Sequence, residues 1–176
     1  MRSLLLWVST VTLSSACGGG VSSSPCEASI TANGANATHD HFSAGAANGD
    51  WSAGDGNGTL DAISLSADFE QALQIEIVGP VPIAGQSITL LADQSTGSLQ
   101  YADASGQTAH RVWTSSEGTL VIDSVIPSTT DHSTSLELHF TNVTAHPSTV
   151  AAGNSATGVI VLDGSARIDG VYLPLL

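Results

Sequence analysis

ISLSADF at residues 63–69 and LQIEIV at residues 73–78 carry the clearest structural pattern in this sequence. In both segments apolar side chains alternate with serine, aspartate, glutamine or glutamate. A period of two places alternate side chains on opposite faces of an extended chain. The alternation therefore predicts two strands, each with one buried and one solvated face, and it puts Ile63 and Leu73 on the buried faces.

The same pattern, bounded by turn residues, recurs along the chain. Further strands are predicted at residues 41–44, around 51, and at 87–91, 98–102, 109–115, 119–125, 135–141, 158–162 and 165–168. Gly79-Pro80-Val81-Pro82 should end the strand at 73–78, because proline cannot donate to a strand ladder. Asp163-Gly164 predicts a tight hairpin, and residues 116–118 a further turn. No stretch sustains a helical period, so we predict an all-β protein, an antiparallel β-sandwich or barrel of about 8–10 short strands.

The first twenty residues, MRSLLLWVSTVTLSSACGGG, have the layout of an export signal. A positive start at Arg2 is followed by an apolar run at 4–13 and by small residues at 14–16. Such a run is shorter than the ~20 residues that a membrane-spanning helix needs. We therefore expect residues 1–16 to be a cleaved signal peptide, with Cys17 as the first residue of the mature chain.

Ser14-Ser15-Ala16-Cys17, followed by three glycines, resembles the lipobox of bacterial lipoproteins. The resemblance implies that the Cys17 thiol is joined to diacylglycerol and its amine is acylated, which would anchor the chain to a membrane. Ser14 departs from the Leu, Val or Ile usual in the family. Segments of the remaining chain, such as NGDWSA at 48–53 and ATGVIVL at 156–162, also resemble small lipoproteins that carry one β-domain of unknown function.

After this leader the composition predicts a flexible tether at residues 17–27 and a single β-domain at 28–176. Without Arg2, the mature chain has two cations, Arg111 and Arg167, against 16 carboxylates, a formal charge of −14. Nucleic-acid binding is built on Lys and Arg, so we exclude it. We expect a soluble, monomeric domain that contacts the membrane through its lipid and has an envelope protein as a possible partner.

Two short motifs could bind metal ions. His39 and His41 would point to one side of an extended strand, where they could share Zn²⁺ or Cu²⁺ with further ligands, although solvated polar residues are the simpler interpretation. Asp55, Asn57 and Asp61 place oxygen atoms at alternate positions, as calcium loops do. That segment lacks the EF-hand glycine and glutamate, and its Asp-Gly and Asn-Gly pairs favour a turn. We therefore expect no cofactor, with zinc or copper as the alternative.

Catalysis has little support in the sequence. No Gly-x-Ser-x-Gly motif occurs, and the run at 153–158 misses that spacing by one residue. Arg111 and Trp113 share one face of a predicted strand, where they could contact a partner or form a cation–π pair.

These features lead us to expect a bacterial envelope lipoprotein, most simply in the outer membrane, whose β-domain is a structural or binding module and not an enzyme. Secretion is the alternative location. A periplasmic metal-binding protein using His39 and His41, and an unrecognised hydrolase, are the alternative functions.

Overall fold

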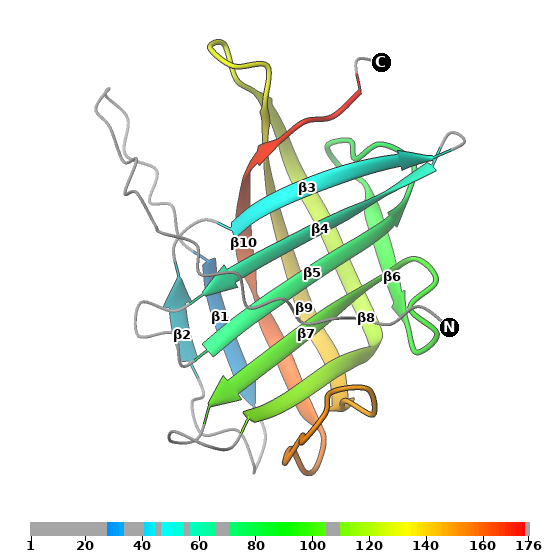
Figure 1. Cartoon of the computed structure of the whole chain (residues 1–176), viewed down its shortest axis with the longest axis vertical. Coiled ribbons are helices and arrows are strands. Elements are labelled where there is room, and N and C mark those ends of the chain that lie inside the picture. The colour runs from blue at the N-terminus through cyan, green and yellow to red at the C-terminus, as the bar shows by residue number, and fades with distance from the viewer. Residues whose placement is uncertain are drawn as a thin grey trace.

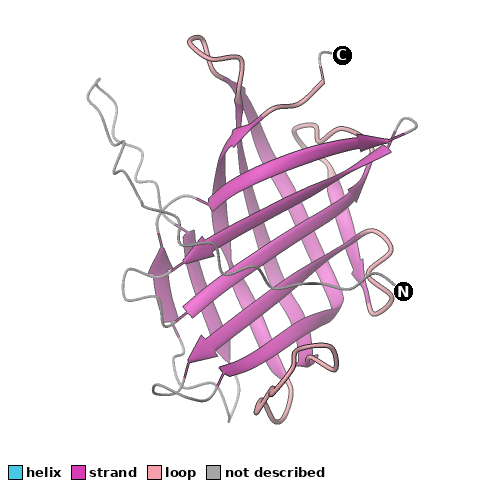
Figure 2. Ribbon diagram, viewed as in Figure 1, coloured by secondary structure: helices cyan, strands magenta, loops and turns pink. Residues whose placement is uncertain are grey.

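The computed structural model describes residues 28–33, 41–44, 47–54, 57–65, 71–104 and 110–174. Within them the protein is all-β, with ten strands in one sheet and no helix (Figure 2). This confirms the predicted fold class. The strands are β1 (Ala28–Asn33), β2 (His41–Ala44), β3 (Ala47–Gly54), β4 (Asn57–Leu65), β5 (Gln71–Gly79), β6 (Ser87–Leu91), β7 (Gly97–Ala104), β8 (His110–Pro127), β9 (Thr134–Pro147) and β10 (Ile160–Val171).

The sheet curls around its core so that two layers face each other (Figure 1). One layer contains β3, β4, β5 and β7, and the other, which crosses it steeply, contains β8, β9 and β10. Beyond these layers, β1 pairs with β10, β2 with β1, and β6 with β8. Strand β7 pairs with β8 on one side of the curl. On the other side, a short parallel pairing of Ile168 and Asp169 with Ala47 and Asn48 joins β10 to β3.

Apolar side chains from both layers fill the space between them. Strand β5 alternates as predicted, with Leu73, Ile75 and Ile77 buried. The largest fully buried side chains are Trp113, Tyr101 and Phe140. The tilted rings of Tyr101 and Trp113 lie 6.0 Å apart between centroids. A core packed with large rings in this way holds the two layers together.

The buried face of β4 differs from the prediction. Leu60 and Ala62 are buried, whereas the side chain of Ile63 is 49% exposed. The reason is the register with β5, which sets Ala62 opposite the buried Ile75 and Ile63 opposite Gln74. Cross-strand partners share one face of a sheet, so Ile63 follows Gln74 outward.

Strands β8 and β10 are longer than predicted, because each contains a segment that was expected to be a turn. Strand β8 continues through residues 116–118 with register shifts on both sides of Glu117. Strand β10 continues through Asp163-Gly164, where a register shift replaces the predicted hairpin. At that shift a carboxylate oxygen of Asp163 accepts a hydrogen bond from the Asn142 amide at 2.7 Å. Both strands pair with β9 on either side of these sites, so turn residues there make bulges in place of reversals.

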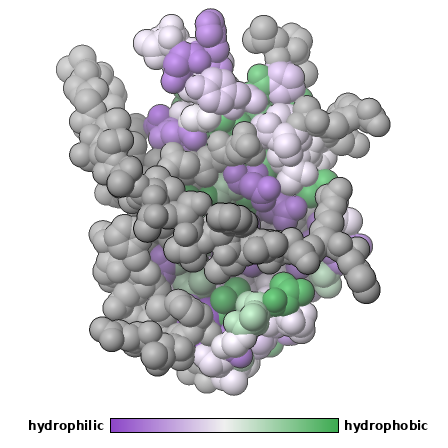
Figure 3. Space-filling view, viewed as in Figure 1, coloured by the Kyte–Doolittle hydropathy of each residue, from purple (hydrophilic) through white to green (hydrophobic). Residues whose placement is uncertain are grey.

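Other predicted breaks are confirmed. Strand β5 ends at Gly79, and the β8–β9 connection spans residues 128–133. In that connection the amide and hydroxyl of Ser133 donate to Asp131 at 3.1 and 2.7 Å. Hydrogen bonds from Ser128 and Ser133 lower the pKa of Asp131 to about 2. The connection forms a hydrophilic projection at the top of the molecule (Figure 3).

Candidate functional site

Among the described residues, the solvent-facing side of β8, β9 and β10 gathers a group of polar side chains, most of them in contact with one another, which we call the outer polar face. Its members are Asp123, Ser124, Ser135, Glu137, His139, Ser165, Arg167 and Asp169. They alternate with buried residues such as Leu136, Leu138, Ala166 and Ile168. Three twisted strands with one apolar side therefore place these groups together on the opposite side.

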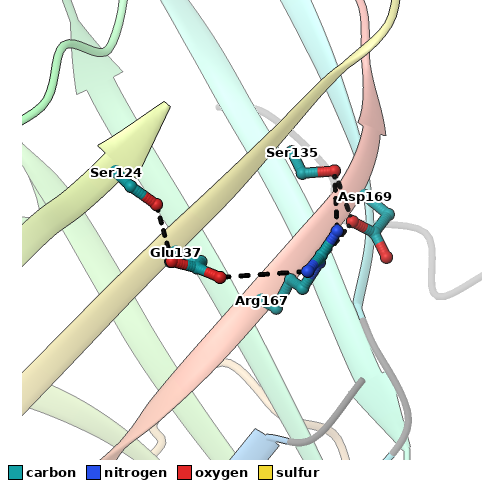
Figure 4. Close-up of polar contacts among 5 residues, drawn as sticks. All are labelled: Ser124, Ser135, Glu137, Arg167 and Asp169. Carbon is teal, nitrogen blue, oxygen red and sulfur yellow. Dashed lines mark hydrogen bonds and ion pairs between the residues drawn. The ribbon is translucent and has the colours of Figure 1, made fainter. Parts of the chain in front are cut away.

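Arg167 lies at the centre of one network on this face (Figure 4). Its Nε donates to Asp169 Oδ1 at 2.9 Å, and its Nη1 lies 3.8 Å from Glu137 Oε1. Ser135 donates to the same Asp169 oxygen at 2.6 Å, and Ser124 donates to Glu137 Oε2 at 2.7 Å. One guanidinium thus links two carboxylates from neighbouring strands. Each pair is partly exposed, so the network orders the face more than it stabilises the fold.

A second pair on this face joins Asp123 of β8 to His139 of β9. The His139 Nδ1 lies 2.8 and 2.9 Å from the two carboxylate oxygens of Asp123. Both side chains are nearly half exposed, at 45% and 46%. Asp123 is the extra residue of a bulge, since Ile122 pairs with Leu138 and Ser124 with Glu137. A bulge re-aims the side chain that it carries, here onto the imidazole.

In the opposite layer, two carboxylates from neighbouring strands lie opposite each other. Asp61 of β4 lies opposite Glu76 of β5, and Glu76 lies opposite Ser98 of β7. Burial, and then the Asp61 charge, raise the pKa of Glu76, while a hydrogen bond from Ser98 opposes the increase.

This placement of Asp61 corrects the predicted calcium loop. Asn57 begins β4, and Asp61 lies four residues further along the same extended strand, about 13 Å away. Ligands of one Ca²⁺ lie about 2.3–2.6 Å from it, so strand positions this far apart do not fit the predicted loop around a single ion. Asp55 lies outside the described residues. The turn interpretation agrees with the register, in which Gly54 pairs with Asn57.

The predicted His39–His41 metal site is only partly within the described residues. His39 lies outside them, and His41 begins β2, where its backbone lies opposite Thr31 of β1. Among the described residues, no group of three or more His, Cys, Asp or Glu side chains is arranged to hold a metal ion. The metal site therefore stays a prediction.

The predicted partner contact at Trp113 is wrong, because the side chain is fully buried. Its indole Nε1 donates to the Gly158 carbonyl at 3.1 Å. Arg111, on the same inward face, lies 3.5 Å from Asp103, with side chains 17% and 0% exposed. Residues 111 and 113 thus belong to the interior, where the arginine charge is matched by a buried carboxylate.

A shallow hollow of about 370 Å³ lies where β8 passes from β7 to β6. Its wall includes Thr114, His146 and Val150, the last of which is 74% exposed. Asn154 fixes the adjoining β9–β10 loop through hydrogen bonds to Val112, Ser148 and Ala156. The sequence run at 153–158 is therefore part of a loop that an asparagine side chain holds in place.

Sequence reasoning missed the outer polar face. The alternation at 135–141 placed Glu137 and His139 on one side of a strand, and that signal was available. Asp123 lies 16 residues before His139 and Arg167 lies 30 residues after Glu137, so no local pattern identifies these partners.

Residues 1–27, which include Cys17 and the predicted signal peptide and tether, lie outside the described residues. In the described part of the chain, no helix has the length and apolarity needed to cross a bilayer. The chain matches no family model, no curated protein and no solved structure at a significant level.

Proposed function

We propose that this protein is a bacterial cell-envelope lipoprotein, anchored through Cys17, whose β-domain serves as a structural or binding module. The observation that carries the proposal is the run Ser14-Ser15-Ala16-Cys17-Gly18-Gly19-Gly20 after a short apolar segment. Two or more acyl chains on one cysteine give stable anchoring, at about 0.8 kcal/mol for each buried methylene.

The charges of the domain support a lipid anchor over an electrostatic one. Both arginines of the mature chain lie in ion pairs, Arg111 with Asp103 and Arg167 with Asp169. The remaining carboxylates leave the domain strongly negative. Anionic headgroups repel such a surface, so the acyl chains must supply the attraction.

The packing of the domain supports a role carried out at its surface. Large side chains fill the space between the layers, including Trp113, Tyr101 and Phe140 with no exposed area. A binding module with this interior would recognise its partner through outward-facing groups such as those of the outer polar face. The eleven-residue tether, with a reach of roughly 15–20 Å, would hold that surface close to the membrane.

The test uses the two cysteines of the chain as variant and matched control. We expect Cys17→Ser to abolish labelling by a radioactive or clickable palmitate and to move the protein from the membrane to the soluble fraction. Cys26→Ser should leave both unchanged. Membrane retention of the unlabelled Cys17→Ser protein would contradict the proposal.

A second variant examines the departure from the family pattern. Ser14→Leu restores the residue usual at that position, so processing to the mature, lipidated form should be faster in a pulse-chase experiment. Slower processing would indicate that residues 14–17 are not read as a lipobox.

A further inference from the structure

A serine completes a row of three side chains across the outer polar face. Ser165 of β10 lies directly opposite His139 of β9 in the strand register. His139 is bonded on its other side to Asp123 of β8. Ser165 is exposed and shares the outward parity of Arg167. Three neighbouring strands therefore present an acid, an imidazole and a hydroxyl in the order Asp, His, Ser.

The contact between Asp123 and His139 determines what the imidazole can do. A carboxylate at Nδ1 favours the neutral tautomer that carries its proton there, which leaves the Nε2 lone pair free to accept a proton. The two ring nitrogens point in roughly opposite directions. With Nδ1 bonded to Asp123 of β8, Nε2 is the ring nitrogen left for a contact with a neighbouring group.

The register brings the hydroxyl near this nitrogen. Directly opposed residues of an antiparallel pair have Cβ atoms about 4.5–5.5 Å apart. Rotation about χ1 of Ser165, or one bridging water, would join its Oγ to Nε2. Such catalytic hydrogen bonds are often long in unliganded proteins. Register shifts occur beside both ends of the row, at Ile122/Ser124 in β8 and at Leu162/Gly164 in β10. Bulges are common next to active sites.

We propose that Asp123, His139 and Ser165 form a catalytic site within the outer polar face, in which Ser165 is a nucleophile toward small activated carboxylic esters. Ser165 Oγ attacks the ester carbonyl while His139 Nε2 takes the hydroxyl proton. The tetrahedral intermediate expels the alcohol, which receives that proton, and leaves an acyl group on Ser165. Water, deprotonated by the same imidazole, then releases the acid and restores the serine. Because the face is open, it accepts small substrates and turns them over slowly.

The experiment labels the full mature chain with a fluorophosphonate, whose phosphorus reacts with the serine oxygen and releases fluoride. Peptide mapping by mass spectrometry should place the adduct on Ser165. Hydrolysis of p-nitrophenyl acetate should depend on the same residue. We expect Ser165→Ala to abolish both signals, and His139→Gln to slow labelling at least about tenfold, the lower range of general-base effects.

Ser87→Ala is the matched control, because Ser87 is an exposed strand serine in the same row, separated from His139 by Val121. It should label and hydrolyse as the wild type does. Thermal melts of every variant must match the wild type, so that lost labelling reflects chemistry. Labelling of folded His139→Gln at the wild-type rate, or an adduct confined to other residues, would overturn the proposal. Neither result bears on Cys17 or the membrane anchor.

Discussion

Replacing Asn154 by alanine removes one side chain that holds the β9–β10 loop to strand β8. Its Oδ1 accepts hydrogen bonds from the amides of Val112 and Ala156, both at 2.9 Å. Its Nδ2 donates to the carbonyls of Val112 at 2.8 Å and of Ser148 at 2.9 Å. The amide group thus bonds both backbone groups of Val112, whose carbonyl also accepts a hydrogen bond from the Ser148 amide at 2.8 Å.

The loss can be estimated from these four hydrogen bonds. Each contributes about 0.5–1.5 kcal/mol net, and a backbone group left buried without a partner costs more. The contacts are partly exposed, so water replaces some of them. We therefore expect Asn154→Ala to lower the free energy of unfolding by about 2–4 kcal/mol. For a domain near 150 residues, a loss of 3 kcal/mol corresponds to a fall in Tm of about 6–12 °C.

Urea unfolding followed by tryptophan fluorescence measures this loss, because Trp113 bonds to the same loop through Gly158. Thr157→Ala, at an exposed position of that loop, is the control and should change stability by less than about 0.5 kcal/mol. Asn154→Asp keeps the two acceptor contacts but turns an oxygen toward two carbonyls, so it should also destabilise. An Asn154→Ala protein within 0.5 kcal/mol of the wild type would refute the reasoning.

Three further predictions concern the β3–β5 layer and the histidine pair. Because the pKa of Glu76 is raised in the folded protein, the ionised side chain lowers the free energy of unfolding above that pKa, and this cost disappears as the pH falls through it. Glu76→Gln should therefore raise the free energy of unfolding by several tenths of a kcal/mol at pH 7 in urea titrations and lose that advantage in acid. Equal stability of the two proteins at pH 7 would contradict this. A Cβ at Gly58 would overlap the Trp51 indole, so Gly58→Ala should cost about 1–3 kcal/mol, and an unchanged melting temperature would show that the ring moves freely. Under the metal alternative, zinc bound by purified protein should fall in the His39→Ala/His41→Ala variant when measured by elemental mass spectrometry, whereas a metal-free wild type removes that alternative.

The candidate sites show how far local reasoning extends. Alternation in LQIEIV predicted the buried side of β5 correctly, because three large apolar residues share that side. At β4 the same rule failed for Ile63, since Leu60 and Ala62 compete for the core and the register with β5 decides between the two sides. At residues 111–113 parity correctly grouped Arg111 with Trp113. Parity alone does not tell which side of the strand is buried, and in the structure the buried side is the one that carries Arg111 and Trp113.

The sequence alone determines that this chain forms alternating strands, where prolines end one of them, and how negative its overall charge is. These properties depend on residues close together in the chain or on simple counts. The tertiary structure decides which side of each strand is buried, that Asp163-Gly164 is a bulge inside β10, and that Asp123 meets His139. Those outcomes depend on the register between strands remote in sequence, where a shift of one residue would exchange every inward side chain for an outward one.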